Sequence, residues 1–410
     1  MAINLKKPNL NDIFSVPGIQ LAVTEAGIKY KDKKDLALIL ADEGSHAAAV
    51  FTKNKFIAAP VIIAKKNLKK SSIIRACIIN TGSANAGTGK NGLINAQNTC
   101  DRLASQFHIK SDEVLPFSTG VIMKHLPMEK INQGISALAL ALKLNKATWI
   151  EVAEAIMTTD TVPKVCSKKI MLNDEEVVIT GIAKGSGMIH PNMATMLAFI
   201  TTNASIEHNL LTQIVSEVTE ETFNLISVDG DTSTNDSFVV ISTNKTKKII
   251  VDEQDADFKK LHNIILEVAK YLAHAIVRDG EGATKFIKIQ VCNGQSKLDC
   301  KEIAKKIAHS PLIKTAFFAS DPNLGRIMAA IGNAEVSNID ISKINIYLND
   351  YLFAENGALA TSYDEAIANK EMKKEEISLK IDLQNGNASQ HFYTTDLSYD
   401  YVKINAEYRT

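Results

Sequence analysis

Cysteine is scarce in this sequence, and its spacing argues against two common kinds of structure. The five cysteines, Cys77, Cys100, Cys166, Cys292 and Cys300, are odd in number and never stand in a C-x-x-C pair. This spacing is atypical of a disulfide framework and of a zinc site. Cys77 lies in a mostly apolar run, and we interpret it as a core residue rather than a nucleophile.

The sequence also lacks an excess of charge and any long hydrophobic run. Its 46 basic and 46 acidic side chains balance, whereas proteins that bind nucleic acid usually carry a basic excess for phosphate contacts. No stretch approaches about 18 uncharged apolar residues, and the N-terminus, MAINLKKPNLND, has no apolar signal-peptide core. We therefore expect no nucleic-acid partner, no membrane association and a soluble, cytoplasmic protein.

Motifs that bind nucleotides are incomplete. A phosphate loop ending at Gly89-Lys90 would need glycine where Ala84 stands and a hydroxyl where Asn91 stands. Gly185-Ser-Gly187 fails the dinucleotide pattern because position 190 is histidine. Neither segment predicts a nucleotide cofactor.

Metal-binding patterns are weak as well. The nine histidines form no H-x-x-x-H pair, and we interpret His46, His125 and His190 as surface or loop residues rather than ligands. Asp229, Asp231 and Asp236 could supply oxygen ligands to a cation, but the cluster lacks the remaining features of a calcium loop. We favour the alternative that this segment is a hydrogen-bonded turn that fixes a neighbouring loop. No metal and no cofactor are expected.

The chain does contain the pattern of a folded α/β protein. It is long enough for two or three domain-sized units, with 45% hydrophobic and 22% charged residues. Short apolar runs bounded by turn residues predict strands, and apolar residues at helical spacing predict helices. The charged stretch 369–376 is expected to be an exposed loop. The predicted strands are 19–23, 35–40, 47–51, 60–64, 73–79, 169–172, 176–182, 237–242 and 285–291, and the predicted helices are 91–108, 127–144, 149–157, 208–223 and 257–277.

Six segments are unusually rich in small and polar residues. Such segments expose backbone N–H groups and hydroxyls, which suits loops that line a polar pocket, although any one of them alone would be interpreted as a simple turn. Their number favours a binding site. The segments are 80–89, 118–120, 158–161, 184–187, 229–236 and 279–285.

The segment KGSGMIHPNMATMLAFI, residues 184–200, suggests a specific chemistry. Composition alone favours the view that Thr195 merely opens a buried strand or helix. However, a threonine that follows a small residue can attack the preceding carbonyl and convert that amide to an ester. Hydrolysis then leaves Thr195 with a free α-amine that can serve as base for its own hydroxyl. The ordinary pKa of such an amine, about 7.7–8.0, leaves a useful fraction neutral near pH 7.

The same segment resembles the cleavage-site motif of the ornithine acetyltransferase (glutamate N-acetyltransferase) family. Thr81, Ser83, Gly87, Met123 and Lys124 depart from the pattern usual in that family, but none carries assigned chemistry. Further segments resemble family motifs in the family's order and span nearly the whole chain. They are NTGSANAGTG at 80–89, STGVIM at 118–123, MTTDT at 157–161, SVDGDTSTNDS at 227–237, RDGEGATK at 278–285, DPNLGR at 321–326 and NAEYRT at 405–410.

The resemblance implies a role for particular residues. Thr195 would be the nucleophile, formed by self-cleavage between Ala194 and Thr195, and Thr119 and Gly120 would form the oxyanion hole. Lys184 suits the α-carboxylate of an amino-acid substrate and Glu281 suits its amine; without the motif match both would be ordinary surface charges. The implied substrate contacts are Thr158, Lys184, Thr195, Glu281, Asn405 and Thr410.

The resemblance also implies a fold and an assembly. The fold would be a layered α/β/β/α sandwich, laid out like the N-terminal-nucleophile hydrolases but with a different topology. Cleavage would give chains of residues 1–194 and 195–410 that stay associated, as a heterotetramer of two copies of each.

The implied activity is transfer of an acetyl group from N2-acetylornithine to glutamate through acetyl-Thr195, in a ping-pong mechanism. The sequence leaves open whether acetyl-CoA is a second donor. A self-processing aminopeptidase of similar fold and a non-catalytic amino-acid-binding or nucleotide-binding protein are the alternatives.

Overall fold

The computed structural model describes residues 2–29, 31–144, 147–190 and 196–407. The chain divides into two compact units. We call residues 6–224 and 231–276 the sandwich unit, and residues 1–5, 225–230 and 277–410 the C-terminal unit. Within the described residues, no helix is long and apolar enough to span a bilayer.

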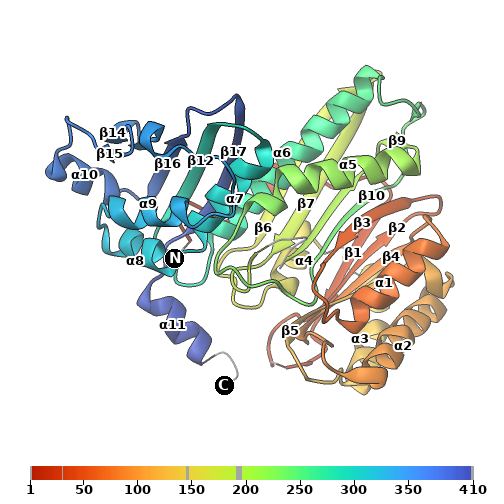
Figure 1. Ribbon diagram of the computed structural model, residues 1–410. Helices are drawn as coiled ribbons and strands as arrows, with labels where there is room; N and C mark the ends of the chain where they lie inside the picture. The colour runs from red at the N-terminus through yellow and green to blue at the C-terminus, as the bar shows by residue number, and fades with distance from the viewer. Residues whose placement is uncertain (1, 30, 145–146, 191–195, 408–410) are drawn as a thin grey trace. The chain divides into compact units, whose positions relative to one another are not determined.

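The sandwich unit contains two β-sheets that face each other (Figure 1). The four-stranded sheet has the order β1-β2-β4-β5 and is antiparallel except for the parallel pair β4–β5. The five-stranded sheet has the order β3-β10-β8-β7-β6. The strands are β1 (Ile19–Thr24), β2 (Leu36–Ala41), β3 (His46–Phe51), β4 (Ala76–Ser83), β5 (Val114–Val121), β6 (Lys164–Leu172), β7 (Glu175–Lys184), β8 (Leu197–Thr202) and β10 (Ser237–Ser242), with the short pair β9 (Ser205–Ile206) and β11 (Ile249–Ile250).

One hydrophobic core fills the space between these sheets. It takes alternate side chains of both sheets, and the rings of Phe117 from β5 and Phe199 from β8 meet edge to face at 4.9 Å. Helix α4 (Trp149–Ile156) contributes five buried side chains to the same core. Thr148 caps this helix, since its hydroxyl accepts from the N–H of Glu151.

Helices cover the outer face of each sheet. A second core packs α1 (Ala59–Lys70), α2 (Gly89–Phe107) and α3 (Met128–Leu144) against the four-stranded sheet. Helices α5 (His208–Glu221) and α6 (Ala256–Arg278) lie along the five-stranded sheet (Figure 1). The layers are therefore helix, sheet, sheet, helix, and the expected α/β/β/α sandwich is confirmed.

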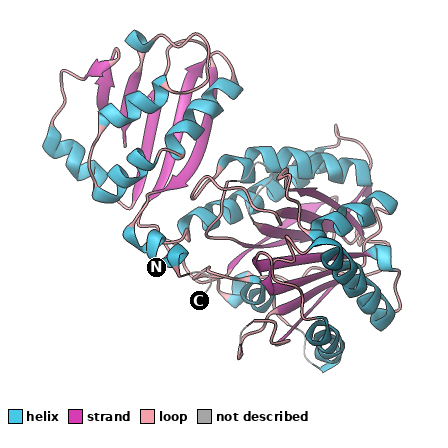
Figure 2. Cartoon of the chain, turned by 60° about the horizontal axis from the view of Figure 1, so that its bottom comes forward, coloured by secondary structure: helices cyan, strands magenta, loops and turns pink. Residues whose placement is uncertain are grey.

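The C-terminal unit contains a six-stranded sheet of order β15-β14-β13-β16-β12-β17 with helices packed on it (Figure 2). Its core joins the strands to buried side chains of α7, α8 and α9. The elements are β12 (Phe286–Gly294), α7 (Lys297–Ala308), α8 (Pro311–Ala319), α9 (Leu324–Gly332), β13 (Asn345–Leu348), β14 (Tyr351–Glu355), β15 (Ala358–Leu359), α10 (Glu365–Met372), β16 (Glu376–Asp382), β17 (Ala388–Thr395) and α11 (Tyr399–Ala406).

Two predictions of local structure are wrong. Residues 60–64 were expected to form a strand but belong to α1, because Pro60 stands in the first turn, where its fixed φ favours a helix and its missing N–H costs nothing. Residues 369–376 were expected to form a loop but include the end of α10 and the start of β16. Asp364 starts α10 by accepting from the N–H groups of Ala366 and Ile367.

Candidate active site

Three of the predicted site residues meet at the ammonium group of Lys184. Lys184 ends β7, Thr119 lies near the end of β5, and Thr158 follows α4. Lys184 Nζ donates to Thr119 Oγ1 at 3.1 Å and to Thr158 Oγ1 at 3.0 Å. Lys184 is only 9% exposed, so these bonds lie in a largely water-free environment. Each sheet and the segment that follows α4 thus supplies one polar group to the same point.

A second buried lysine supports this cluster through Asp160. Lys164 Nζ lies 2.7 Å from Asp160 Oδ1, and both side chains are fully buried. The backbone N–H of Gly185 donates to the same oxygen at 2.6 Å, and that of Thr158 donates to Oδ2 at 3.0 Å. Asp160 therefore fixes the backbone on both sides of the contact between Thr158 and Lys184.

The charges of the cluster keep Asp160 ionised. Burial alone would raise the pKa of Asp160, but the charges of Lys164 and Lys184 and the hydrogen bonds from Lys164 and Gly185 hold it below its ordinary value. Asp236 behaves oppositely: burial raises its pKa well above the ordinary value, against the opposing effects of Ser233, Lys184, Met196 and Thr52. Asp160 therefore stays ionised beside Lys164 and Lys184, whereas burial favours the neutral acid at Asp236.

Gly120 follows Thr119 at a point where two backbones come very close. Its φ is +129°, a conformation that side chains rarely adopt, and a Cβ built there would lie 2.5 Å from the carbonyl carbon of Gly82. Glycine is therefore required at this position for β5 to lie against the end of β4. The Gly120 N–H is thereby held one residue beyond the Thr119 hydroxyl.

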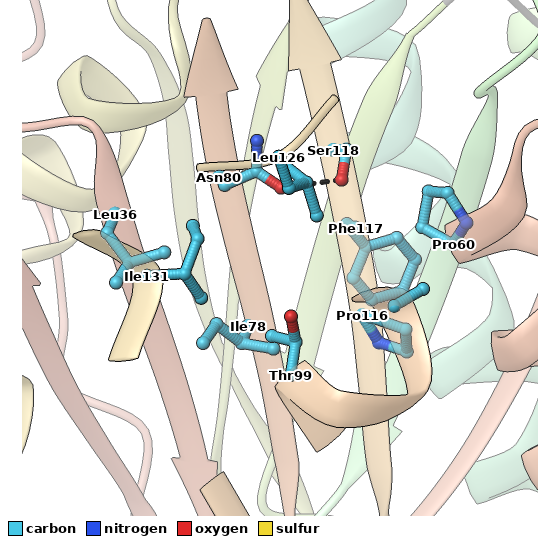
Figure 3. Close-up of a pocket in the computed structure, with 11 residues that line it drawn as sticks. Leu36, Pro60, Ile78, Asn80, Thr99, Pro116, Phe117, Ser118, Leu126 and Ile131 are labelled. Atoms are coloured by element: carbon cyan, nitrogen blue, oxygen red, sulfur yellow. Dashed lines mark hydrogen bonds between the residues drawn. The ribbon is translucent and has the colours of Figure 1, made fainter. Parts of the chain in front are cut away.

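Asn80 and Ser118 form a polar pair on the helix-facing side of the same strands (Figure 3). Ser118 Oγ donates to Asn80 Oδ1 at 2.5 Å, and Asn80 Nδ2 donates to the carbonyl of Ser83 at 2.9 Å. The cavity that they line has a volume of about 10 Å³ and is otherwise mostly apolar. It has room for about one water molecule and none for an amino acid.

The remaining described site residues lie in the C-terminal unit. Glu281 is 8% exposed and follows α6 in a turn, and Asn405 is an exposed residue of α11. Asn405 Nδ2 donates to Glu281 Oε2 at 2.8 Å and to the carbonyl of Tyr401 at 3.0 Å. Gly282 allows this contact, because a Cβ there would lie 2.4 Å from the N atom of Tyr401. The structure therefore joins two predicted substrate contacts that are 124 residues apart.

Ala194, Thr195 and Thr410 lie outside the described residues. The chain is described again from Met196, and the first residue of β8, Leu197, pairs with Lys184 across the antiparallel β7–β8 ladder. The strand that follows the predicted cleavage point is therefore a hydrogen-bonded neighbour of the strand that precedes it.

Sequence reasoning missed several residues of the cluster. Asp160 and Asn235 were part of the polar segments 158–161 and 229–236 without an individual role, and Lys164 lay outside those segments. Within the predicted turn at 229–236, Asn235 does bind a neighbouring loop: its Nδ2 donates to the carbonyl of Ala84, which lies between β4 and α2. Among the residues that the structure describes, no group of three or more His, Cys, Asp or Glu side chains could hold a metal ion.

Comparison with known proteins identifies relatives along the whole chain. The model of the ArgJ family matches residues 20–410. An arginine biosynthesis bifunctional protein ArgJ from Neisseria meningitidis is 50% identical over 412 residues and covers 100% of both chains. The crystal structure of an arginine biosynthesis bifunctional protein from Bacillus halodurans is 35% identical, with a TM-score of 0.50, and the match covers 52% of this chain and 99% of that chain.

Proposed function

The chain belongs to the ArgJ family, and from that premise we propose that it transfers an acetyl group from N2-acetylornithine to glutamate through Thr195. It is an enzyme of arginine biosynthesis, as its full-length relatives are named. That relationship favours the acyltransferase over an aminopeptidase or a binding protein. The structural observation that carries the mechanism is the buried Lys184–Thr119–Thr158 cluster.

The first step is self-cleavage. Thr195 Oγ attacks the carbonyl carbon of Ala194, the peptide C–N bond breaks, and residues 194 and 195 become joined by an ester. Water then hydrolyses the ester and leaves a carboxylate on Ala194 and a free amine and hydroxyl on Thr195. The flexible composition before Thr195, with glycines and Pro191, suits a segment that must reach this geometry.

The sheet pairing explains how both products would stay together. Strands β7 and β8 flank the proposed cleavage site and remain hydrogen-bonded from Ile179–Thr202 to Lys184–Leu197. Strand β3, from the first product, also pairs with β10, from the second. In addition, the Bacillus halodurans chain corresponds to 52% of this one, close to the share of residues 195–410, which are 216 of 410.

The transfer reaction then uses the new N-terminus. The Thr195 amine accepts the proton of its own hydroxyl, and Oγ attacks the acetyl carbonyl of N2-acetylornithine. The negative oxygen of the tetrahedral intermediate accepts hydrogen bonds from the Thr119 hydroxyl and the Gly120 N–H. Because Thr119 Oγ1 accepts a hydrogen bond from Lys184, the Thr119 hydroxyl can donate its own proton to the negative oxygen. Collapse releases ornithine with a proton on its amine, and the glutamate amine attacks the Thr195 ester in the second half.

Recognition of both substrates follows from their charges. N2-acetylornithine and glutamate each carry an α-carboxylate, which suits the buried ammonium of Lys184. Glu281 suits a substrate amine, and Asn405 orients that carboxylate by a hydrogen bond. Thr158 and Thr410 complete the proposed contacts. We also propose acetyl-CoA as a second donor, a heterotetramer of two copies of each product, and action in the cytoplasm.

Two assays test this function. Purified protein should run as two chains on a denaturing gel, the second beginning Thr-Met-Leu, whereas Thr195→Ala should remain one inactive chain. The wild type should form N-acetylglutamate from glutamate and N2-acetylornithine, and a parallel reaction tests acetyl-CoA as donor. An intact wild-type chain, or the absence of transfer from N2-acetylornithine, would refute the proposal.

A further inference from the structure

Asn235 bridges the two backbone segments that meet beside the proposed oxyanion hole. Its amide nitrogen Nδ2 donates to the carbonyl of Ser118 at 2.9 Å and to the carbonyl of Ala84 at 2.7 Å. The first carbonyl belongs to β5 and the second follows the end of β4. Asn235 is 8% exposed, so neither bond competes with bulk water. Its contacts are 117 and 151 residues away in the sequence.

The bridge stands where the regular strand pairing fails. The parallel β4–β5 ladder runs in register from Ala76–Val114 to Gly82–Gly120 and then shifts at Ser83. The close backbone approach of Gly82 and Gly120 lies at the same place. At that point the Asn235 amide adds a side-chain bridge to the backbone bond from Ala84 N to the carbonyl of Val121 at 3.0 Å, and together they hold the two segments.

The bond to Ser118 also sets the orientation of the next residue. A peptide unit is planar, so a fixed Ser118 carbonyl fixes the N–H and the Cα of Thr119. The following peptide carries the Gly120 N–H. Both proposed oxyanion donors therefore depend on a peptide that Asn235 holds directly. Displacement of a reacting group by about 1 Å can cost on the order of 100-fold in rate.

Asn235 itself has a rigid support. Thr234 Oγ1 donates to Asn235 Oδ1 at 2.6 Å, which leaves the amide nitrogen to face the two carbonyls. Its own segment is tied to residues 52–58, since Ala58 N donates to the carbonyl of Thr234 and Thr52 N to that of Asp236, each at 3.0 Å. The side chain of Ser118 is held separately, since its Oγ donates to Asn80 Oδ1. Ser118 is thus held from two directions.

We propose that Asn235 is a positioning residue, which sets the geometry of Thr119 and Gly120 through the backbone carbonyls of Ser118 and Ala84. This inference rests on the proposed function, because the oxyanion hole is part of it. Asn235 touches no reacting atom in this role and acts through the peptide that it holds.

The same strand provides a matched control. Asn67 is 2% exposed, and its Nδ2 donates to the carbonyls of Ser111 and Val114, at the opposite end of β5. Asn67→Asp and Asn235→Asp therefore remove the same kind of bridge from the same strand, with the same change of shape and charge. Of the two bridges, only that of Asn235 lies next to Thr119.

The experiment compares steady-state kinetics and hydrogen exchange of the full-length wild type and both variants. Asn235→Asp should lower kcat by about 10- to 100-fold with KM within about twofold, the signature of an interaction that matters in the transition state. Asn67→Asp should keep kcat within about threefold. Amide exchange in a peptide containing Thr119 and Gly120 should accelerate in Asn235→Asp and not in Asn67→Asp.

Each contrary result has a defined meaning. An unchanged kcat in Asn235→Asp, an equal loss in both variants, or a loss confined to KM would overturn the positioning role. If Asn235→Asp does not fold, Thr234→Val replaces it, because this change removes the donor to Asn235 Oδ1. The same criteria then apply, and kcat should fall about three- to tenfold. A wild type without acetyl transfer would refute the proposed function alone, and the exchange of Thr119 and Gly120 would still decide on Asn235.

Discussion

Both units of the protein bury lysines, and the most deeply buried one of each unit, Lys164 and Lys314, is held in a different way. Lys164 of the sandwich unit contacts the fully buried carboxylate of Asp160. Lys314 of the C-terminal unit donates to the hydroxyls of Thr394 and Thr395 and to the carbonyl of Thr395. Burial lowers the pKa of Lys314 to about 8, although Asp396 and Asp229 oppose the shift. A carboxylate partner fixes a charge in the interior, whereas neutral acceptors leave it close to titration.

This difference matches the proposed work of the two units. The sandwich unit places the Lys184 ammonium beside Thr119, where we propose that an oxyanion and a substrate carboxylate are stabilised. The C-terminal unit presents a carboxylate, Glu281, oriented by an exposed amide. The Lys314 ammonium donates there to Thr394 and Thr395, at the end of β17.

The largest expected effect is on activity, from Lys184→Met. Loss of the ammonium removes the donor to Thr119 and Thr158 and the proposed carboxylate partner at once. We expect kcat/KM to fall by about 1,000-fold or more, since an oxyanion donor alone contributes on the order of 100- to 1,000-fold. The kcat/KM of Lys314→Met, assayed in parallel, should stay within about tenfold of the wild-type value. Equal losses in the two variants would remove the functional distinction between the units.

The next effect is on stability, from Lys164→Met. This change leaves Asp160 buried without its closest countercharge, which typically costs about 3–5 kcal/mol. Lys314→Met leaves hydroxyls and a carbonyl without a donor but no unpaired charge, and should cost about 1–3 kcal/mol. Urea unfolding of the two variants measures the difference. A larger cost at Lys314 would contradict the view that Lys164 is held by charge.

Substrate binding should be affected more moderately, through Glu281. Glu281→Gln keeps the shape but removes the charge offered to a substrate amine, and a charged hydrogen bond contributes about 1.5–3 kcal/mol. We expect KM to rise by about 10- to 100-fold, with a much smaller change in kcat. Asn405→Ala removes only a neutral donor to that carboxylate and should raise KM by about three- to tenfold. A loss confined to kcat would instead place Glu281 in the chemical step.

The sequence predicted the layers and most elements correctly, and the reason for each failure is local. The run at 60–64 is β-branched and apolar, and Pro60 in the first turn together with packing against the four-stranded sheet turns it into α1. Propensity is a weak guide when tertiary packing decides.

The candidate site could be predicted only as far as its motifs reach. Lys184, Thr119 and Thr158 were found by resemblance, and the structure brings them together. Lys164 could not be distinguished from a solvated lysine, because its burial depends on the packing of α4 and β6. Asn235 could not be connected to Ser118, because 117 residues separate them and the sheet order decides which loops meet.

The smallest expected effect is a pair of opposite pH dependences of stability. The pKa of Lys314 is lower in the folded state, about 8, than in an unfolded chain, about 10.4. Between these values the unfolded chain binds more protons, so this lysine makes stability rise with pH. The pKa of Asp236 is raised in the folded state. Above about pH 4 Asp236 therefore binds fewer protons in the unfolded chain than in the folded protein. Its contribution makes the free energy of unfolding fall as pH rises.

Thermal melts over a pH series can separate these contributions. Relative to the wild type, Lys314→Met should be more stable at pH 7 than at pH 10, with a difference on the order of 1–3 kcal/mol. Asp236→Asn should gain relative stability as pH rises from 5, because the amide resembles the neutral acid. Parallel curves for wild type and variants would show that neither group titrates differently in the folded protein.

The most direct test of the account is the mass of the two chains after incubation with N2-acetylornithine alone. If transfer passes through Thr195, the chain that begins at Thr195 should gain one acetyl group, and fragmentation should locate that group on Thr195. The acetyl group should be lost when glutamate is added. Double-reciprocal plots should then be parallel. A chain that acquires no acetyl group from the donor alone, together with intersecting plots, would contradict transfer through Thr195.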